Sequence, residues 1–259
     1  MDMLAKYKVV AKRYEDMLMN TEGALGVMHL GGGVARERAD EHSDIDIAVF
    51  SYDKLDIKEG EQLSEEGYDV EIFNICINKG FDDWDPIKKE AYAEGIIARD
   101  TNGIVKDFMD KALFYDEEFR CRYLAKNIFD IAWHGWIYTP FRNQNVKGYN
   151  WILPNNLWHQ RGEISNDYYL TNWCINSFIE LLFVVNRKWT PDFKWRWIRS
   201  CHLEKLPSNY KENMSYLLFE PWNEDTWLQK GKVFQRMIDE VIPMVIDDMP
   251  EDWYNLLEH

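Results

Sequence analysis

The chain has 259 residues, a formal net charge of −15 at pH 7 and a hydrophobic fraction of 46%. Its length suits two small domains, and its apolar content suffices for a buried core in each. An excess of negative charge repels a nucleic-acid backbone and attracts cations, which disfavours a long DNA or RNA substrate and favours a cationic small molecule. The four cysteines form no Cys-x-x-Cys pair, which argues against a zinc site or a redox motif.

The N-terminal residues 1–14 are charged and lack the apolar core of a signal peptide. No apolar run of the sequence approaches the ~20 residues that a transmembrane helix needs. We therefore expect a cytoplasmic protein without a membrane partner.

The first half of the chain predicts one helix and three strands. Apolar residues recur at helical spacing over residues 4–19. The apolar runs at residues 25–30 and Ile45–Ser51 predict two strands, and residues 68–77 predict a third because they are rich in β-branched and aromatic side chains. The polar segment at residues 55–67 is expected to form a loop with a short helix.

Residues 81–104 predict a helical connection, then a short edge strand at residues 95–98 and a turn at residues 100–103. Beyond residue 116 the pattern is helical and rich in tryptophan, with helices expected at residues 117–136, 157–161, 167–186, 191–203, 211–218 and 226–245. The predicted fold class is α+β. A small mixed β-sheet with flanking helices occupies residues 1–115, and an all-α helical bundle occupies residues 116–259.

The most informative motif is a glycine turn followed by two closely spaced aspartates. Gly31, Gly32 and Gly33 follow the first predicted strand, and Asp44 and Asp46 stand at the start of the second. Side chains two residues apart on a strand point to the same face, so the two carboxylates lie side by side. Hard divalent cations such as Mg²⁺ prefer all-oxygen ligands and commonly take one or two carboxylates together with substrate phosphates. The motif therefore indicates a site for a metal-bound triphosphate.

This stretch resembles the signature of the polymerase-beta-like nucleotidyltransferase superfamily, and most closely its branch of small-molecule and antibiotic nucleotidyltransferases. The positions that match the branch are Gly31, Gly32, Ala35, Arg36, Ala39, Asp40, Glu41, Ser43, Asp44, Ile45 and Asp46. Two positions depart from it. Gly33 replaces the family's phosphate-contacting serine, and Glu37 replaces a second loop glycine. The first departure leaves backbone N–H groups to hold phosphate. The second places a carboxylate near a polyanion, which is unfavourable unless Arg36 or Arg38 pairs with it.

The resemblance implies roles for individual residues. Asp44 and Asp46 would be catalytic residues that bridge two Mg²⁺ ions, and Glu71, on the third predicted strand, would bind the second ion or act as a base. Asp69 lies on the same strand face as Glu71 and is the alternative to it. The nucleotide would be held by Gly31, Gly32, Gly33, Arg36 and Ser43.

The helical half carries a second resemblance. Residues 180–195 are similar to the C-terminal helical region of uncharacterised proteins that carry this same branch. Further nucleotide-contact candidates are Arg161, Asn186, Arg187 and Lys194. Glu180 interrupts an apolar helix, where an unpaired acid is costly. It is expected either to pair with Arg187 or another base, or to serve as a general base or acceptor contact.

The reaction implied is Mg²⁺-dependent transfer of a nucleoside monophosphate from a nucleoside triphosphate, with ATP the expected donor, and release of pyrophosphate. The acceptor would be a hydroxyl of a small, cationic compound that is aminoglycoside-like or lincosamide-like, in keeping with antibiotic resistance. Two alternatives stay open: transfer to a protein or RNA end, as in toxin-antitoxin pairs, and nucleotide binding without catalysis. The chain would act as a monomer or a homodimer.

Overall fold

The computed structural model describes residues 2–133, 145–146, 149–150, 162–221 and 223–256. It divides the chain into two compact units, Met1–Phe114 and Tyr115–His259. The first unit carries two hydrophobic clusters and the second carries one.

The first unit is a five-stranded sheet with helices on both faces. Its elements in chain order are α1 (Met3–Met19), β1 (Ala24–His29), β2 (Ile45–Ser51), β3 (Gly60–Leu63), β4 (Asp69–Cys76), a 3₁₀ turn (Ile77–Lys79), α2 (Pro86–Ala93), β5 (Ile96–Asp100) and α3 (Ile104–Ala112).

The strand order of the sheet is β3-β4-β2-β1-β5. β2 and β4 run parallel, whereas β1 is antiparallel to both β2 and β5, and β3 is antiparallel to β4. The mixed sheet confirms the predicted α+β class, and β5 is an edge strand, as expected from its sequence.

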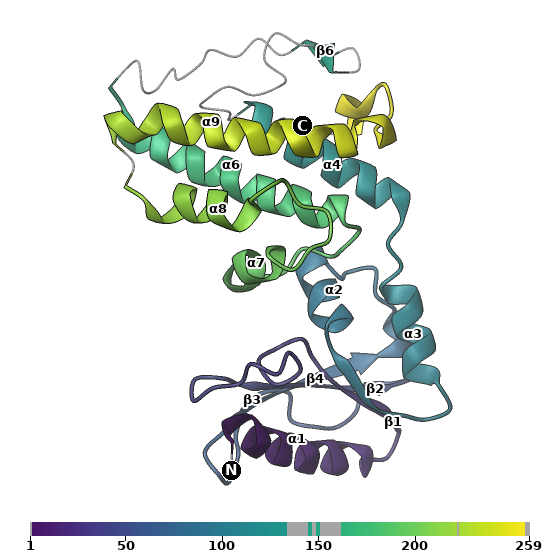
Figure 1. Cartoon of the computed structure of the whole chain (residues 1–259). Coiled ribbons are helices and arrows are strands. Elements are labelled where there is room, and N and C mark those ends of the chain that lie inside the picture. The colour runs from purple at the N-terminus through teal and green to yellow at the C-terminus, as the bar shows by residue number, and fades with distance from the viewer. Residues whose placement is uncertain (1, 134–144, 147–148, 151–161, 222, 257–259) are drawn as a thin grey trace. The chain divides into compact units, whose positions relative to one another are not determined.

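The two faces of the sheet bury different residues. Ile45, Ile47 and Val49 pack with α1, whereas Ala48 and Phe50 pack with α2 and α3. Figure 1 shows α1 on one side of the sheet and α2 and α3 on the other. Because side chains alternate along a strand, Asp46 belongs to the α2 and α3 face. α1 therefore supports the acid-bearing strand from behind.

Two elements of the first unit differ from the sequence expectation. Residues 60–63, expected in a loop with a short helix, form β3, which pairs with β4. Its polar, exposed sequence is typical of an edge strand and lacks the apolar alternation that marks a half-buried one. α3 was not predicted. It begins after Gly103, and the Asp100 carboxylate accepts the N–H groups of Val105 and Lys106 at 2.9 Å each.

The second unit is helical. Its elements are α4 (Glu117–Trp133), β6 (Asn145–Val146), β7 (Tyr149–Asn150), α6 (Ile164–Val185), α7 (Phe193–Ser200), α8 (Tyr210–Phe219), α9 (Glu224–Val241) and 3₁₀ turns at Ile242–Met244, Ile246–Asp248 and Trp253–Leu256.

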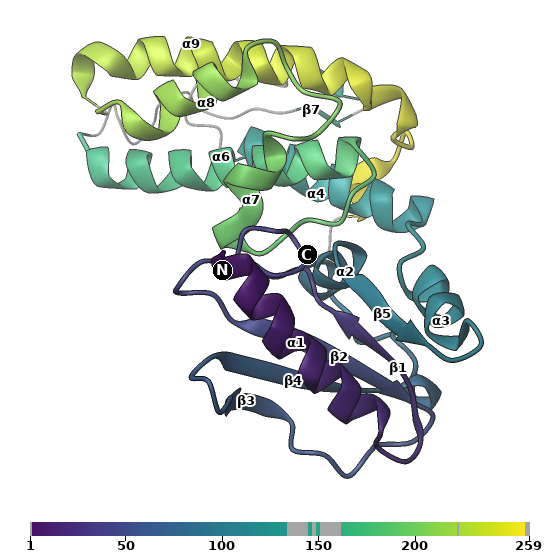
Figure 2. The ribbon, with the colours of Figure 1, turned by 60° about the horizontal axis from the view of Figure 1, so that its bottom comes forward.

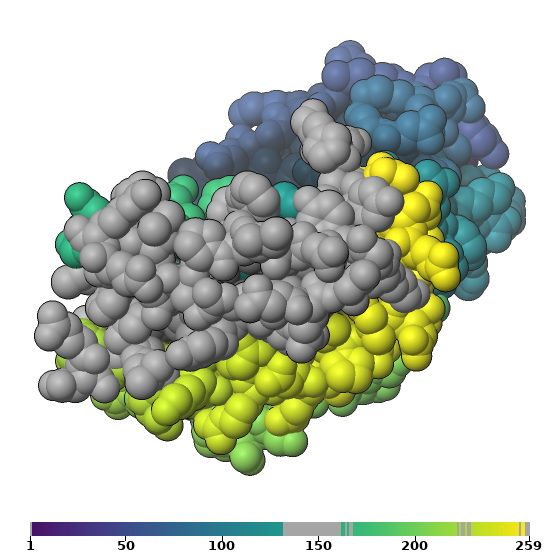
Figure 3. Space-filling view, turned by 90° about the horizontal axis from the view of Figure 1, so that it is seen from above, coloured from purple at the N-terminus to yellow at the C-terminus, as the bar shows by residue number. Residues whose placement is uncertain are grey.

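One core joins these helices, with Leu124 from α4, Phe178 and Leu182 from α6, Met214 from α8 and Phe234 from α9. Figure 2 shows α4 and α6 side by side within this unit, and Figure 3 shows the C-terminal turns, in yellow, beside the end of α9. The predicted helix at residues 157–161 falls outside the described residues. Among the described helices, none is both long and apolar enough to cross a membrane.

Candidate active site

The glycine turn lies directly against the Asp46 carboxylate. β1 ends at His29, and the Leu30 N–H donates to the carbonyl oxygen of Asp46 at 2.9 Å. A Cβ atom added at Gly32 would overlap Asp46 Oδ2. A side chain at position 32 would therefore displace the Asp46 carboxylate, whereas glycine lets the turn approach the acid.

The first two glycines use their N–H groups within the protein. Gly31 N donates to Ala91 O and Gly32 N donates to Leu30 O, each at 2.7 Å. Within the described part of the chain, the N–H groups of the next three residues, Gly33, Val34 and Ala35, donate no hydrogen bond. The chain then turns as in the first turn of a helix, with Arg36 N donating to Gly32 O at 3.1 Å. The N–H groups left to hold an anion thus begin at Gly33.

The predicted acids share one face at one end of the sheet. Asp46 and Glu71 are paired in the parallel register of β2 and β4. Asp44 is exposed immediately before β2 and, two residues from Asp46, belongs to the same face. Asp69 begins β4 and is exposed on that face as well. Within the described residues, the carboxylates of Asp44 and Glu71 take part in no hydrogen bond or ion pair.

Negative charge accumulates at this end of the sheet. Burial, followed by the charges of Glu61 and Asp44, raises the pKa of the Glu71 carboxyl. Glu61 lies on β3 directly opposite Glu71. Sequence reasoning missed it because β3 itself was not predicted. From the other side, burial and the charge of Asp46 raise the pKa of the buried Tyr92 hydroxyl on α2. A bound cation would relieve this repulsion.

The donor set fits a hard divalent cation in part. Carboxylate oxygens are the ligands that Mg²⁺ prefers, and one or two of them suffice when substrate phosphates complete the shell. No group of three or more His, Cys, Asp and Glu side chains within the described residues is close enough to hold a metal ion alone. Asp44, Asp46 and Glu71 therefore fit a metal that arrives with a triphosphate.

Arg36 forms a buried ion pair. Its Nη2 atom donates to both carboxylate oxygens of Glu90 on α2, at 2.7 and 2.8 Å. The two side chains are only 5% and 7% exposed. The sequence prediction assigned this guanidinium to the nucleotide phosphates. In the structure it ties the glycine turn to α2, and its contact with phosphate stays a prediction.

The space beside Gly33 is filled by Ser43. A Cβ atom at position 33 would lie 2.9 Å from Ser43 Oγ and 3.3 Å from Ser43 Cβ. Ser43 Oγ accepts the Asp40 N–H at 2.9 Å and donates to Asp40 Oδ1 at 3.2 Å. The serine hydroxyl that closes the loop therefore occupies the place where a side chain at residue 33 would begin.

Glu37 has a left-handed backbone, with φ of 56°. Such a conformation strains a residue that has a side chain, whereas glycine adopts it readily. Lys8, at 2.9 Å, pairs with the Glu37 carboxylate and lowers its pKa. The basic partner of Glu37 is thus Lys8 of α1, where the sequence offered Arg36 or Arg38.

This geometry agrees with the comparisons with known proteins. Residues 21–130 match the nucleotidyltransferase domain family. The match supports a transferase that moves a nucleoside monophosphate. Families of this kind generally use a nucleoside triphosphate and a divalent metal.

A solved structure, that of a nucleotidyltransferase-like protein from Exiguobacterium sibiricum 255-15, is similar to the chain with a TM-score of 0.46 and 10% sequence identity. The likeness covers 94% of this chain and 76% of the other. A search of curated proteins found no match. The functional assignment therefore rests on the match to the nucleotidyltransferase domain and on the acids within it.

The remaining nucleotide-contact candidates lie in the second unit. Arg161 falls outside the described residues. Asn186 caps α6 and hydrogen-bonds Leu182 O at 2.7 Å and Lys205 O at 2.9 Å. Arg187 pairs with Glu117, and Lys194 is exposed near the start of α7.

Glu180 is paired rather than isolated. Its Oε1 atom lies 2.6 Å from Arg196 Nη1, and its Oε2 atom lies 3.5 Å from Lys126 Nζ. Asn176 donates to Oε1 at 3.2 Å. Of the expected alternatives, the structure shows pairing with another base, and that base is Arg196 in place of Arg187.

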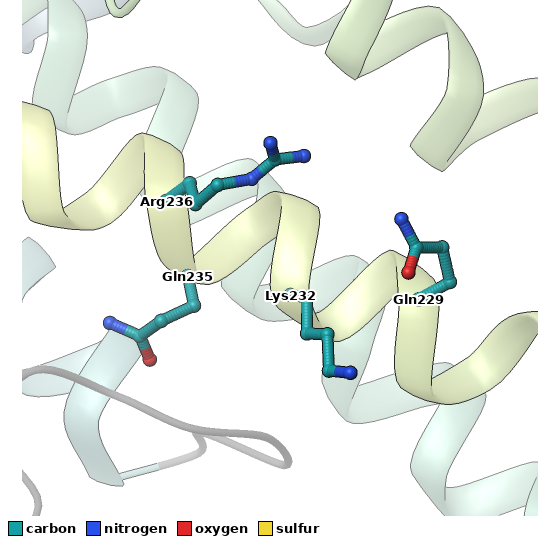
Figure 4. A pocket seen from close by; sticks show the side chains of 4 residues that line it. All are labelled: Gln229, Lys232, Gln235 and Arg236. Carbon is teal, nitrogen blue, oxygen red and sulfur yellow. The ribbon is translucent and has the colours of Figure 1, made fainter.

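A cavity of about 440 Å³ in the second unit is lined by Gln229, Lys232, Gln235 and Arg236 of α9. Figure 4 shows Gln229 and Arg236 on one side of the helix and Lys232 and Gln235 on the other.

Proposed function

We propose that the protein transfers a nucleoside monophosphate from a nucleoside triphosphate, with ATP as the expected donor, to a hydroxyl of a small acceptor. The acceptor hydroxyl gives its proton to a base, for which Glu71 is the first candidate, and its oxygen forms a bond to the α-phosphorus. The bond from that phosphorus to the pyrophosphate oxygen breaks, and pyrophosphate leaves. The observation that carries the proposal is the pairing of Asp46 with Glu71 beneath a glycine turn that contacts Asp46.

Asp44, Asp46 and Glu71 would hold Mg²⁺, with Asp69 as the alternative to Glu71. When bound, the metal supplies positive charge that stabilises the attacking and leaving oxygens. The carboxylates themselves fix where that charge sits. Asp46 and Glu71 belong to adjacent strands of the sheet, so the ladder sets their separation.

The glycine turn is proposed to receive the triphosphate. Gly31 and Gly32 allow the turn to lie against β2 and α2. The N–H groups from Gly33 to Ala35, which donate no hydrogen bond within the described residues, are proposed to hold the phosphates. Arg36 keeps the turn in place through Glu90, and Ser43 closes the loop beside Gly33. This arrangement supports phosphate binding without a serine at residue 33.

The second unit is proposed to contribute specificity. We retain residues 1–115 as the nucleotidyltransferase domain and residues 116–259 as a helical domain that supplies nucleotide or acceptor contacts. Candidates for these contacts are Arg161, Asn186, Arg187, Lys194 and, for a cationic acceptor, Glu180. The net charge of −15 favours a cationic acceptor over a nucleic acid. Aminoglycoside-like and lincosamide-like compounds are the first to test.

The test is release of pyrophosphate from each of the four nucleoside triphosphates, with Mg²⁺ and a panel of hydroxylated cationic compounds. Asp44→Asn is compared with Asp53→Asn, a control at an exposed aspartate beyond the other end of β2. The proposal predicts turnover that Asp44→Asn abolishes and Asp53→Asn retains. Transfer of labelled nucleotide to a protein or RNA end would replace the small acceptor with a macromolecule. Turnover by Asp44→Asn at the wild-type rate would overturn the metal assignment.

A further inference from the structure

A buried tyrosine of α1 reaches the backbone that leads into the acids. Tyr7 is 3% exposed, and its hydroxyl donates to the carbonyl oxygen of Ser43 at 2.8 Å. Ser43 immediately precedes Asp44. The hydrogen bond spans 36 residues of sequence, so it joins the N-terminal helix to the start of β2 from the face opposite the acids.

Each of the three polar groups of Ser43, its N–H, its hydroxyl and its carbonyl oxygen, takes part in a hydrogen bond. Its N–H donates to Asp40 O at 3.2 Å, and its hydroxyl accepts the Asp40 N–H at 2.9 Å. Both of these contacts lie within the loop and move with it. Of the hydrogen bonds described for Ser43, the one from Tyr7 alone anchors it to an element outside the loop.

Asp44 needs such an anchor more than Asp46 does. Asp46 lies inside β2 and is fixed by pairing with β4, whereas Asp44 precedes the first residue of the strand. Within the described residues, no side chain pairs with the Asp44 carboxylate. The direction of that carboxylate is therefore set by the peptide group between Ser43 and Asp44, whose carbonyl oxygen Tyr7 holds.

The same tyrosine contacts the second acid-bearing strand. Its ring meets Tyr68 edge-on, with centroids 4.7 Å apart and an interplanar angle of 68°. Tyr68 precedes Asp69, where β4 begins. Since Ile45 pairs with Val70, the two strands begin side by side, and Tyr7 supports the start of both.

We propose that Tyr7 is a positioning residue for Asp44, and that it holds this carboxylate in the direction required for metal and nucleotide. The inference rests on the proposed function for its catalytic consequence. Its structural content, a start of β2 held rigid by Tyr7, stands on the hydrogen bond and the ring contact alone.

The experiment compares Tyr7→Phe with Tyr14→Phe. Tyr14 lies on the same helix, packs partly against the same core and makes no hydrogen bond within the described residues. Both substitutions keep the ring and remove one hydroxyl. Hydrogen–deuterium exchange is measured over residues 38–46, with β1 as an internal check of folding. Steady-state pyrophosphate release is then measured as a function of nucleotide and Mg²⁺ concentration.

Tyr7→Phe should exchange faster at residues 38–46 with β1 unchanged. We expect its kcat to fall by about tenfold and its Mg²⁺ half-saturation to rise, because small displacements of a catalytic group are costly to rate. Tyr14→Phe should match the wild type in each measurement. Equal exchange at residues 38–46 in both variants would overturn the proposal, as would faster exchange with unchanged kcat and Mg²⁺ dependence. If the wild type releases no pyrophosphate while Tyr7→Phe still exchanges faster, the proposed function fails and the structural anchor stands.

Discussion

Substituting serine for Gly33 should destabilise the loop, because the Ser43 side chain already fills the space beside this residue. The new Cβ atom would lie 2.9 Å from Ser43 Oγ, closer than non-bonded atoms tolerate. Ser43 would have to shift, which weakens its two hydrogen bonds with Asp40. Each such bond contributes about 1 kcal/mol, and overpacking typically costs about 1–3 kcal/mol. We expect Gly33→Ser to lower the free energy of unfolding by about 2 kcal/mol.

A double-mutant cycle with Ser43→Ala isolates this effect. Ser43→Ala alone leaves the Asp40 N–H without its partner and should cost about 1 kcal/mol. In the double variant the clash with Oγ is gone and one hydroxyl returns to the same space. The double variant should therefore lose about 1 kcal/mol less unfolding free energy than the sum of the losses in the two single variants. Urea unfolding of the four proteins, with m-values compared, gives the coupling. Costs that add to within about 0.3 kcal/mol would refute the claim that the two side chains compete for one space.

Three further predictions concern the rest of the nucleotidyltransferase unit. Glu37→Gly should raise the midpoint of thermal unfolding, because relief of its positive φ outweighs the loss of an exposed pair with Lys8; a lower midpoint would contradict this. Glu90→Gln should lower the free energy of unfolding by about 3 kcal/mol in urea, because it removes the charge of the buried carboxylate that pairs with Arg36. Burial, only partly offset by a nearby acid, lowers the pKa of His29. Stability from this residue is therefore present above about pH 6.5, the ordinary pKa of histidine, and is lost as pH falls towards the folded-state pKa. His29→Gln should reduce the slope of the unfolding free energy against pH in that range. An unchanged slope would contradict the claim that His29 has a lowered pKa in the folded state.

The strands that carry the acids could be predicted from the sequence because the composition of each strand indicates that it is buried. β2 is an apolar run interrupted by Asp46, and β4 is rich in β-branched residues around Glu71. Such patterns depend only on near neighbours in the chain. The edge strand β3 carries no comparable pattern, since it is polar and exposed, so Glu61 was missed with it.

The partners of the site residues could not be predicted because they are distant in sequence. Arg36 meets Glu90 across 54 residues, and Tyr7 meets Ser43 across 36. A guanidinium beside a glycine turn is a reasonable phosphate ligand, and the sequence gives no sign of the buried carboxylate that pairs with it. The left-handed backbone at Glu37 was likewise invisible in the residue itself. Its signal was the glycine found at that position in the family that the motif resembles.

The most direct test of the metal and nucleotide site is calorimetric titration of nucleoside triphosphate into the protein, with Mg²⁺ and with EDTA. The described acids do not form a complete metal site alone, so Mg²⁺ without nucleotide should bind weakly. With Mg²⁺ present, one triphosphate should bind to the wild type, and the Asp44→Asn/Asp46→Asn variant should lose this binding. Equal binding in EDTA, or equal binding by the double variant, would contradict the assignment of these carboxylates to a metal-bound triphosphate.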